Sequence, residues 1–250
     1  METWSCHRAY QRYLNKFSQA VNQRVFGNLF RWFFSELKFD NYTLDLESTV
    51  MVRDGSQEGV AKGYNPKRPG RLSHHPLLAF VSDVRIIANY WLRPGNTSAS
   101  TNYLSFLEDT LSKLEGKRVL VCMYSDFFAK EILDYLEMKG LHYIIACRFN
   151  NRIKYSLTHE HKWIELTDGL EISETVYQAN GWEKPRRIVM VRQDIDKRPK
   201  AAGKQIKQLE LFEDEEDFGK YRYSCFVTDL DLPPRSYMTH IAEGRILRIG

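Results

Sequence analysis

The sequence predicts an α/β protein built around a mixed β-sheet. One segment, Thr43–Arg53, alternates with the two-residue period of a strand, and two apolar runs, Lys117–Asp126 and Leu141–Arg148, have the composition of buried strands. A helical pattern precedes each of these two runs, and alternation of strands with helices is typical of an α/β layout. At 250 residues the chain is long enough to bury a sizeable core.

The segment Thr43–Arg53 is unusual because it carries two carboxylates on one face. Asp45 and Glu47 alternate with Leu44 and Leu46, so the acidic and apolar side chains are expected on opposite faces. A buried carboxylate needs a cation, a metal or hydrogen-bond donors to offset its desolvation. Two interpretations stay open at this point: an edge strand with a solvated acidic face, and an acidic site.

The other elements of the first 150 residues follow from periodicity and from breakers. A helix is expected over Val21–Leu37, with Phe26, Leu29, Phe30, Phe33 and Leu37 as its buried stripe. The polar, Gly/Pro-rich residues 54–76 are expected to form a loop segment. Further expectations are a hairpin of Leu77–Phe80 with Val84–Leu92, a helix capped by Ser100 or Thr101 that ends near Gly116, and a helix over Phe127–Lys139 stopped by Gly140.

After Asn150 the pattern changes to short strands. We expect strands at Trp163–Leu166, Glu171–Tyr177, Arg186–Gln193 and Tyr221–Thr228, with few helical signals between them. The resulting scheme is an N-terminal helical segment (1–40), an α/β core (41–150), a β-rich insertion (151–228) and the start of a last core segment (229–250).

Composition excludes several classes of protein. No apolar run is long enough for a membrane span, and the N-terminus has no signal-peptide core, so a cytoplasmic protein without a membrane partner is expected. Cys6, Cys122, Cys147 and Cys225 have no zinc spacing, and buried thiols are expected for those within strands. A net charge of +4 with 36 basic residues permits a nucleic-acid partner.

The block QEGVAKGYNPKRPGRLSHHPLLAF (Gln57–Phe80) is highly specific. Together with the acidic strand before it and LRPGNTSAST (Leu92–Thr101) after it, it resembles the DDE transposases of bacterial insertion sequences. The resemblance covers about residues 20–234 and implies a ribonuclease-H-like core with a β-strand insertion. It also implies metal-dependent DNA cleavage and strand transfer, with Mg²⁺ or Mn²⁺ held by three carboxylates from different elements.

The carboxylates that the resemblance implies depart from the family pattern. Glu47 stands where the family has its first Asp, and Tyr124 stands where it has the second, which leaves Asp45 and Asp126 as nearby alternatives. Asp126 has a second interpretation, as the N-cap of a helix that begins at Phe127. Glu243 is the candidate for the third carboxylate. These departures, with a late start and an early stop relative to the family, lead us to expect a decayed or truncated copy.

The expected DNA-binding residues are cations interleaved with polar and aromatic side chains. They are Lys62, Tyr64, Asn65, Lys67, Arg68 and Arg71 in the block, with Arg186 and Arg187 in the insertion. Trp163 and Trp182 are candidates for stacking on a base, although packing in the core is the commoner fate of tryptophan. His74 and His75 are adjacent in an extended segment, which favours a structural or DNA-proximal role over a shared metal.

Three functions are compatible with these observations. The first is a transposase-family protein for DNA transposition that acts on double-stranded element ends, with impaired catalysis and an expected homodimer. The second is a non-catalytic DNA-binding remnant that uses Lys62–Arg71 and the insertion. The third is a product that folds poorly.

Overall fold

The computed structural model describes residues 7–14, 16, 18–38, 40–65, 67–158, 162–196, 216–218, 220–233 and 236. Most of the segment 229–250, Glu243 included, therefore lies outside the described residues. In the part that is described, no helix combines the length and the apolar character that crossing a membrane requires.

Five strands form the first half of a ten-stranded sheet, in the order β6-β5-β1-β7-β8. Strands β1 (Asn41–Ser48), β7 (Arg118–Met123) and β8 (His142–Ala146) are parallel neighbours. Strands β5 (Leu77–Val81) and β6 (Ile86–Trp91) form the antiparallel hairpin that completes this half. The sheet is thus mixed, as the sequence predicts, and β1 lies in its middle.

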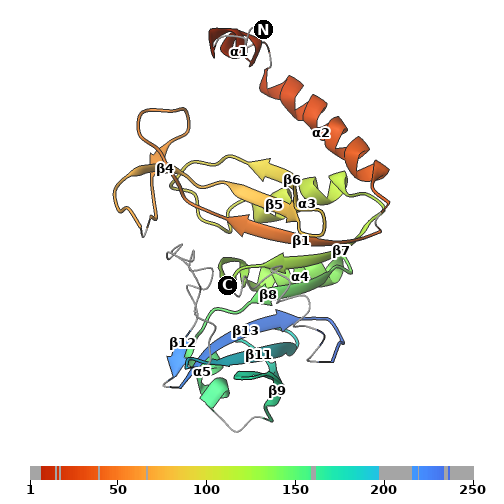
Figure 1. Cartoon of the computed structure of the whole chain (residues 1–250), viewed down its shortest axis with the longest axis vertical. Helices are drawn as coiled ribbons and strands as arrows, with labels where there is room; N and C mark the ends of the chain where they lie inside the picture. The colour runs from red at the N-terminus through yellow and green to blue at the C-terminus, as the bar shows by residue number, and fades with distance from the viewer. Residues whose placement is uncertain are drawn as a thin grey trace.

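The strands of the insertion continue the same sheet. They are β9 (Ile164–Thr167), β10 (Leu170–Tyr177), β11 (Arg186–Asp194), β12 (Glu216–Phe218) and β13 (Tyr221–Thr228). Strand β13 pairs antiparallel with β8 and so joins the insertion to the core. Figure 1 shows these strands at the end of the molecule opposite to α1 and α2.

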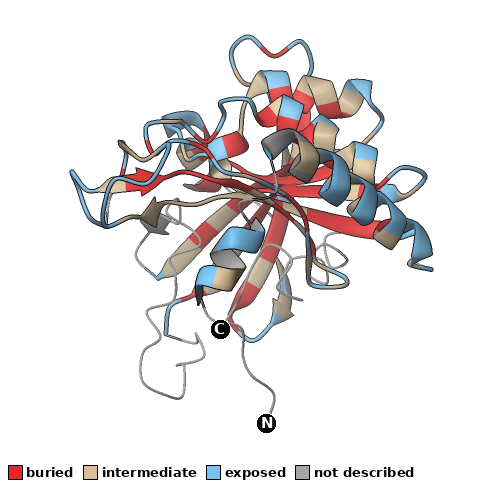
Figure 2. Ribbon diagram, turned by 90° about the horizontal axis from the view of Figure 1, so that it is seen from above, coloured by how far each residue is buried: buried red, intermediate tan, exposed pale blue. Residues whose placement is uncertain are grey.

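The helices that the structure describes are α1 (His7–Leu14), α2 (Gln19–Glu36), α3 (Tyr103–Lys113), α4 (Lys130–Met138) and α5 (Asn151–Thr158). All of them except α1 contribute buried residues to the main hydrophobic core. Phe34 of α2, Phe106 of α3 and Leu133 of α4 join one cluster with the central strands. Figure 2 shows the strands as largely buried ribbons with most of the helices on one side.

The pleat of β1 separates its apolar from its acidic side chains. Leu44 and Leu46 are fully buried in the main core, whereas Asp45 and Glu47 are half-buried on the opposite face. On that opposite face the neighbouring strand β7 contributes Cys122 to a second, smaller apolar cluster. The expected alternation of the acidic strand is therefore confirmed over β1.

The expected strand Thr43–Arg53 was too long, because β1 ends at Ser48. The main-chain N–H of Thr49 donates to the carbonyl of Pro76 (3.4 Å), and the chain then leaves the large sheet. It enters a three-stranded sheet of β2 (Met51–Val52), β4 (Leu72–His74) and β3 (Ala61–Lys62). We call residues 51–74 the small sheet. The Gly/Pro-rich composition of this segment had hidden its short strands.

Several helix boundaries also differ from the expectation. Asn102 in the left-handed region, rather than Ser100 or Thr101, precedes α3, and it makes no side-chain cap bond. The expected helix Phe127–Lys139 is split into a 3-10 turn at Ser125–Phe127 and α4, although Gly140 ends it as predicted with φ 65°. Helix α5 was missed because its eight residues carry only two apolar anchors, Ile153 and Leu157.

Helix α2 buries a different stripe from the one predicted. Phe34 is buried and Phe30, Phe33 and Leu37 pack partly against the core, whereas Phe26 and Leu29 are about half exposed, at 49% and 47%. The periodicity was read correctly for the C-terminal half. The N-terminal half extends past the sheet (Figure 1), so no core lies beneath it.

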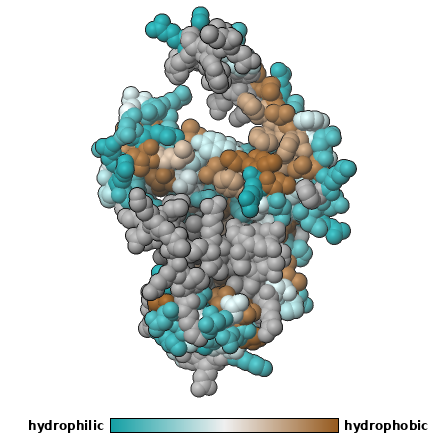
Figure 3. Space-filling model, viewed as in Figure 1, coloured by the Kyte–Doolittle hydropathy of each residue, from teal (hydrophilic) through white to brown (hydrophobic). Residues whose placement is uncertain are grey.

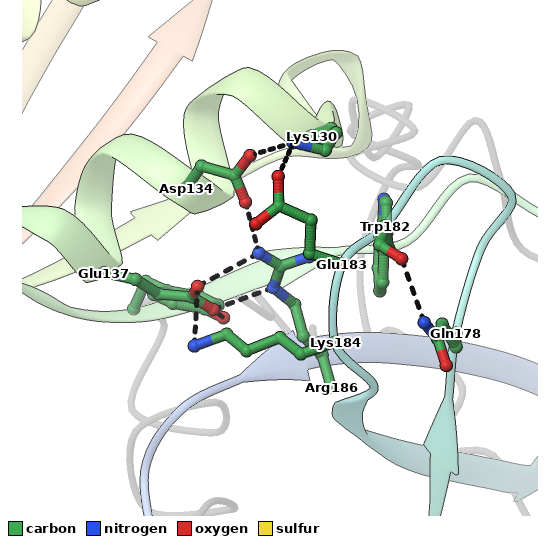
Figure 4. A network of polar contacts seen from close by, with 9 residues as sticks. Lys130, Asp134, Glu137, Gln178, Trp182, Glu183, Lys184 and Arg186 are labelled. Atoms are coloured by element: carbon green, nitrogen blue, oxygen red, sulfur yellow. Dashed lines mark hydrogen bonds and ion pairs between the residues drawn. The ribbon is translucent and has the colours of Figure 1, made fainter.

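A network of ion pairs fastens the insertion to the core at the start of β11. The Arg186 guanidinium donates to Glu137 (2.7 Å) and Asp134 (2.6 Å) of α4, and it lies 4.6 Å from the centre of the Trp182 ring. Lys184 adds a second cation at 3.0 Å from Glu137 (Figure 4). Burial alone raises the pKa of Glu137, but the bonds from Arg186, Lys184 and Tyr143 outweigh it and lower that pKa to about 2.

This depressed pKa predicts a dependence of stability on acid. Because the folded value is about 2 and the ordinary value is 4.5, the stabilisation is complete above pH 4.5 and is lost as pH falls towards 2. The shift corresponds to about 3 kcal/mol. We expect Glu137→Gln to be less stable than the wild type at neutral pH, and the gap to narrow between pH 5 and pH 3 in urea unfolding. A gap that stays constant across this range would contradict the assignment.

Candidate functional site

The parallel pairing of β1 with β7 builds an edge where acidic side chains gather. The pairing includes Asp45 with Cys122 and ends with Leu46 opposite Met123. Glu47 and Tyr124 are the next residues of the two strands, so they leave the sheet side by side and on the same face. The sequence-predicted Glu47 therefore lies next to Tyr124, the position at which the resemblance implies a second carboxylate.

Asp45 lies on the same face, one pleat further into the sheet. Its carboxylate accepts a hydrogen bond from the Ser82 hydroxyl at the β5–β6 turn. The same turn contributes Asp83, whose carboxylate accepts from the main-chain N–H of Thr43 at 2.5 Å. The Asp45 carboxylate is thus held by hydrogen bonding within the sheet, about 6.6 Å along the strand from Glu47.

Asp126 lies just beyond the end of β7, in the 3-10 turn. Arg148, which follows β8, donates to its carboxylate at 3.1 Å, and both side chains are more than half exposed. The N-cap interpretation of Asp126 was wrong, because α4 begins at Lys130 with Ala129 at its N-cap position. Asp126 therefore stays at the same edge as Glu47 and Tyr124, paired with a cation on the protein surface.

The described residues do not assemble a metal site. No group of three or more His, Cys, Asp or Glu side chains converges among them. Tyr124, which follows β7, is a phenol at the position where the resemblance implies a carboxylate, the Asp45 oxygen is engaged by Ser82, and Asp126 faces Arg148. Glu243, the expected third carboxylate, lies outside the described residues. Carboxylates from β1 alone do not meet the near-octahedral oxygen set that Mg²⁺ requires.

A buried arginine that the sequence reasoning missed organises this edge. Arg93 is 5% exposed, and its guanidinium donates to the carbonyls of His75 (2.9 Å) and Thr101 (2.7 Å) and to the Ser48 hydroxyl (3.2 Å). Burial lowers its pKa to about 10. Arg93 thereby ties the residue after Glu47 to the loop that follows β6. Its place in the Leu92–Thr101 motif was the available signal.

The adjacent histidines act separately and inside the protein. A ring nitrogen of His74 lies 3.0 Å from the carbonyl of Glu58, and Nδ1 of His75 lies 2.6 Å from the carbonyl of Thr97. Burial is the main cause that lowers the pKa of His75, which favours its neutral form. Both side chains therefore support loops, in agreement with the expected structural role.

The small sheet presents most of the candidate DNA-binding side chains to solvent. Lys62, Tyr64, Lys67, Arg68 and Arg71 are all exposed. Arg71 pairs with Asp54, whereas no described carboxylate pairs with Lys62, Lys67 or Arg68. Figure 3 shows hydrophilic residues over the outer part of these loops, and Figure 1 places them beyond the arrowhead of β1.

Two glycines lock the small sheet against the loop that carries Arg93. A Cβ on Gly63 would lie 1.8 Å from the carbonyl oxygen of Gly95, and a Cβ on Gly95 would lie 2.3 Å from the hydroxyl oxygen of Ser73. The two main chains can approach this closely only without side chains. The KGYNP and RPGN segments are therefore in contact in the folded protein, which sequence spacing alone did not reveal.

The candidate residues of the insertion are used inside the protein. Arg186 is 5% exposed within the ion-pair network, and Arg187 bonds to Glu174 and to the carbonyls of Leu230 (2.8 Å) and Leu232 (2.9 Å). The candidate stacking rings are also packed. Arg192 lies 4.3 Å from the centre of the Trp163 ring, and Trp182 is 9% exposed.

A cleft lined by the candidate residues of the insertion is not at the acidic edge. It has a volume of about 410 Å³ and is lined by Glu137, Arg186, Arg187 and Asp229, among others. Asp229 bonds His142 and Tyr143 at the start of β8, whereas Glu47 and Tyr124 lie at the strand ends. The cleft and the acidic edge therefore lie at opposite ends of the parallel strands.

Comparison with known proteins identifies the fold. A family model described as "Transposase DDE domain group 1" matches residues 5–198. A solved piggyBac transposase synaptic complex with hairpin DNA is similar, with a TM-score of 0.50 and 12% identity over 96% of this chain. This chain spans 46% of the length of that one, and the likeness confirms the predicted ribonuclease-H-like fold.

An Argonaute from Marinitoga piezophila, solved with a 5′ OH guide RNA, is a more distant structure. It has a TM-score of 0.34 and 9% identity, and the match covers 86% of this chain and 27% of the Argonaute. No curated protein matches the sequence.

The close contact between Gly63 and Gly95 predicts that a glycine-to-alanine substitution lowers fold stability at position 63 but not at position 27. We expect Gly63→Ala to destabilise the fold by about 1–3 kcal/mol, because the new Cβ overlaps the Gly95 carbonyl. Gly27→Ala in α2 is the matched control, since nothing lies within 4 Å of its Cβ, and it should stabilise by up to about 1 kcal/mol. Thermal unfolding measures both, and equal midpoints for the two variants would refute the close contact.

Proposed function

This chain belongs to the transposase DDE domain group 1 family, and we propose on that premise that it binds double-stranded DNA beside the acidic edge of β1 and β7. The small sheet supplies the contacts to phosphates through Lys62, Lys67, Arg68 and Arg71, with Asn65 holding the loop. Cations on exposed loops suit phosphate contacts, which position a duplex without reading its sequence.

The register of β1 against β7 is the observation that carries this proposal. It brings Glu47 to the end of the sheet, and the chain needs only Thr49 and Val50 to pass from β1 into the small sheet. A duplex held by the small sheet therefore lies next to the acidic edge. The two features form one continuous surface rather than two separate sites.

The residues at the acidic edge support DNA cleavage less well than the small sheet supports DNA binding. Strand cleavage in this family generally uses divalent metal, and a bound Mg²⁺ or Mn²⁺ would polarise the phosphate and activate the attacking oxygen. Asp45, Glu47 and Asp126, with Glu243, are the carboxylates proposed for that role. Because Tyr124 replaces one expected ligand, the described residues support DNA binding better than cleavage.

A double-stranded element end is the proposed partner, and a homodimer is proposed as the acting form. The neighbouring piggyBac complex is a synaptic assembly with hairpin DNA, and it supports a DNA partner for this chain by analogy of fold. The alternative function is a DNA-binding protein without cleavage activity, which the phenol at the edge favours.

Salt dependence tests the binding surface. Wild-type protein should bind duplex DNA with a steep negative slope of log affinity against log salt, and Lys67→Ala with Arg68→Ala should make that slope shallower by about two. A matched pair, Arg118→Ala with Lys139→Ala, lies at the opposite ends of the strands and should leave the slope unchanged. A flat slope in the wild type, measured by fluorescence anisotropy, would reject DNA binding.

A gain of metal affinity tests the acidic edge. We expect Tyr124→Asp combined with Glu47→Asp to bind Mn²⁺ at least about tenfold more tightly than the wild type, because it restores a second carboxylate beside β1. Tyr90→Asp on edge strand β6 adds the same charge elsewhere and should have no effect. Isothermal titration calorimetry provides the affinities. Equal binding by all three proteins would show that this edge is not the metal-binding position.

A further inference from the structure

Tyr64 is the described aromatic residue best placed to meet a bound nucleic acid. It is 69% exposed, the largest exposed fraction of any tyrosine or tryptophan that the structure describes. The two tryptophans that the sequence suggested for stacking are covered by Arg192 and Arg186. The stacking role therefore has a different candidate, which lies on the small sheet rather than on the insertion.

The loop around Tyr64 is fixed on both sides. Gly63 before it is pressed against the Gly95 carbonyl, where no side chain fits. Asn65 after it is 5% exposed, and its side-chain oxygen Oδ1 accepts from the main-chain N–H of Arg68 at 3.0 Å. The Tyr64 ring is thus exposed to solvent between two residues, Gly63 and Asn65, whose positions are fixed. Such a ring gains contact area on binding at a small cost in conformational entropy.

Charge around the ring indicates an anionic strand as its partner. Lys62 precedes it, and Lys67 and Arg68 follow it on the same exposed loop. Cations that follow a phosphate backbone, together with an aromatic face on which a base lies, are the shared features of proteins that bind single strands. In an intact duplex both faces of every base are covered by stacking. The ring therefore suits a base that has left the stack.

We propose that Tyr64 stacks on an unpaired base of the bound DNA, next to the acidic edge. The inference rests on the proposed DNA binding and makes it more specific, since it distinguishes distorted from regular duplex. Stacking tolerates any base, so Tyr64 would recognise the distortion rather than a sequence. Tyr64 follows β3 of the small sheet, which the chain enters two residues after β1 ends.

The test compares two DNA duplexes that differ at one nucleotide. One is fully paired, and the other carries a central unpaired 2-aminopurine. We expect Tyr64→Ala to weaken binding of the second duplex by about 5- to 100-fold and to leave binding of the paired duplex unchanged. Tyr64→Phe should bind both duplexes like the wild type. Quenching of 2-aminopurine fluorescence on binding should occur with Phe or Tyr at this position and be lost with Ala.

Tyr155→Ala is the matched control, because that tyrosine is 65% exposed on α5, and it should change neither affinity nor quenching. If Tyr64→Ala weakens both duplexes equally, or neither, stacking is overturned while the proposed DNA binding stands. If the wild type binds neither duplex, both the DNA binding and the stacking are overturned. A melting temperature of Tyr64→Ala within a degree or two of the wild type separates lost stacking from misfolding.

Discussion

Parallel pairing of β1 with β7 is the constraint on which the site depends. Because side chains alternate along a strand, a shift of one residue in this register would turn Glu47 into the main core and bring Leu46 to the acidic face. The full burial of Leu44 and Leu46 fixes the register, since exposing them would cost about 2 kcal/mol each. The apolar core therefore determines where the carboxylates lie, although it does not touch them.

A second constraint couples the small sheet to this edge. Arg93 is a buried cation that donates to main-chain carbonyls and to the Ser48 hydroxyl, so no carboxylate among these acceptors offsets its desolvation. Such an arrangement is stable only when the donors are well satisfied. Loss of one loop would leave part of the guanidinium unpaired, so the loops around Arg93 are expected to be ordered together. The close approach of Gly63 and Gly95 holds the same loops from the other side.

Sequence reasoning recovered the parts of this molecule that depend on local pattern. Strands β10, β11 and β13 were predicted within one residue or less at each end, because each is rich in β-branched and aromatic residues. The pairing of β13 with β8 was not predicted, since nothing local records which strand edge is free. The same limit explains Arg186, an exposed-looking cation in sequence that tertiary contact with α4 buries.

At the candidate site, the local sequence pattern indicated the types of side chain but not their spatial arrangement. The alternation of Asp45 and Glu47 was visible, and so was the basic composition around Tyr64. Arg93 lies 45 residues from Ser48, to which it donates, and Gly95 lies 32 residues after Gly63, so only long-range packing connects each pair. Asp126 shows the opposite error, because a plausible cap residue followed by an apolar pattern was read as a helix start where the chain makes a 3-10 turn.

DNA binding and DNA cleavage, as proposed for this chain, depend on different residues of the structure. The small sheet depends on backbone pairing, on the glycine contact and on Arg93, none of which involves the residue at position 124. A tyrosine there is compatible with the end of β7, because aromatic residues favour strands, whereas a metal ligand must place an oxygen to within about 1 Å. A phenol at position 124 in place of the carboxylate that the resemblance implies is therefore compatible with an intact small sheet, the surface proposed to bind DNA. Loss of DNA cleavage and retention of DNA binding are consequently compatible in one chain. The geometry of the small sheet, which favours DNA binding, does not depend on a metal ligand at the acidic edge.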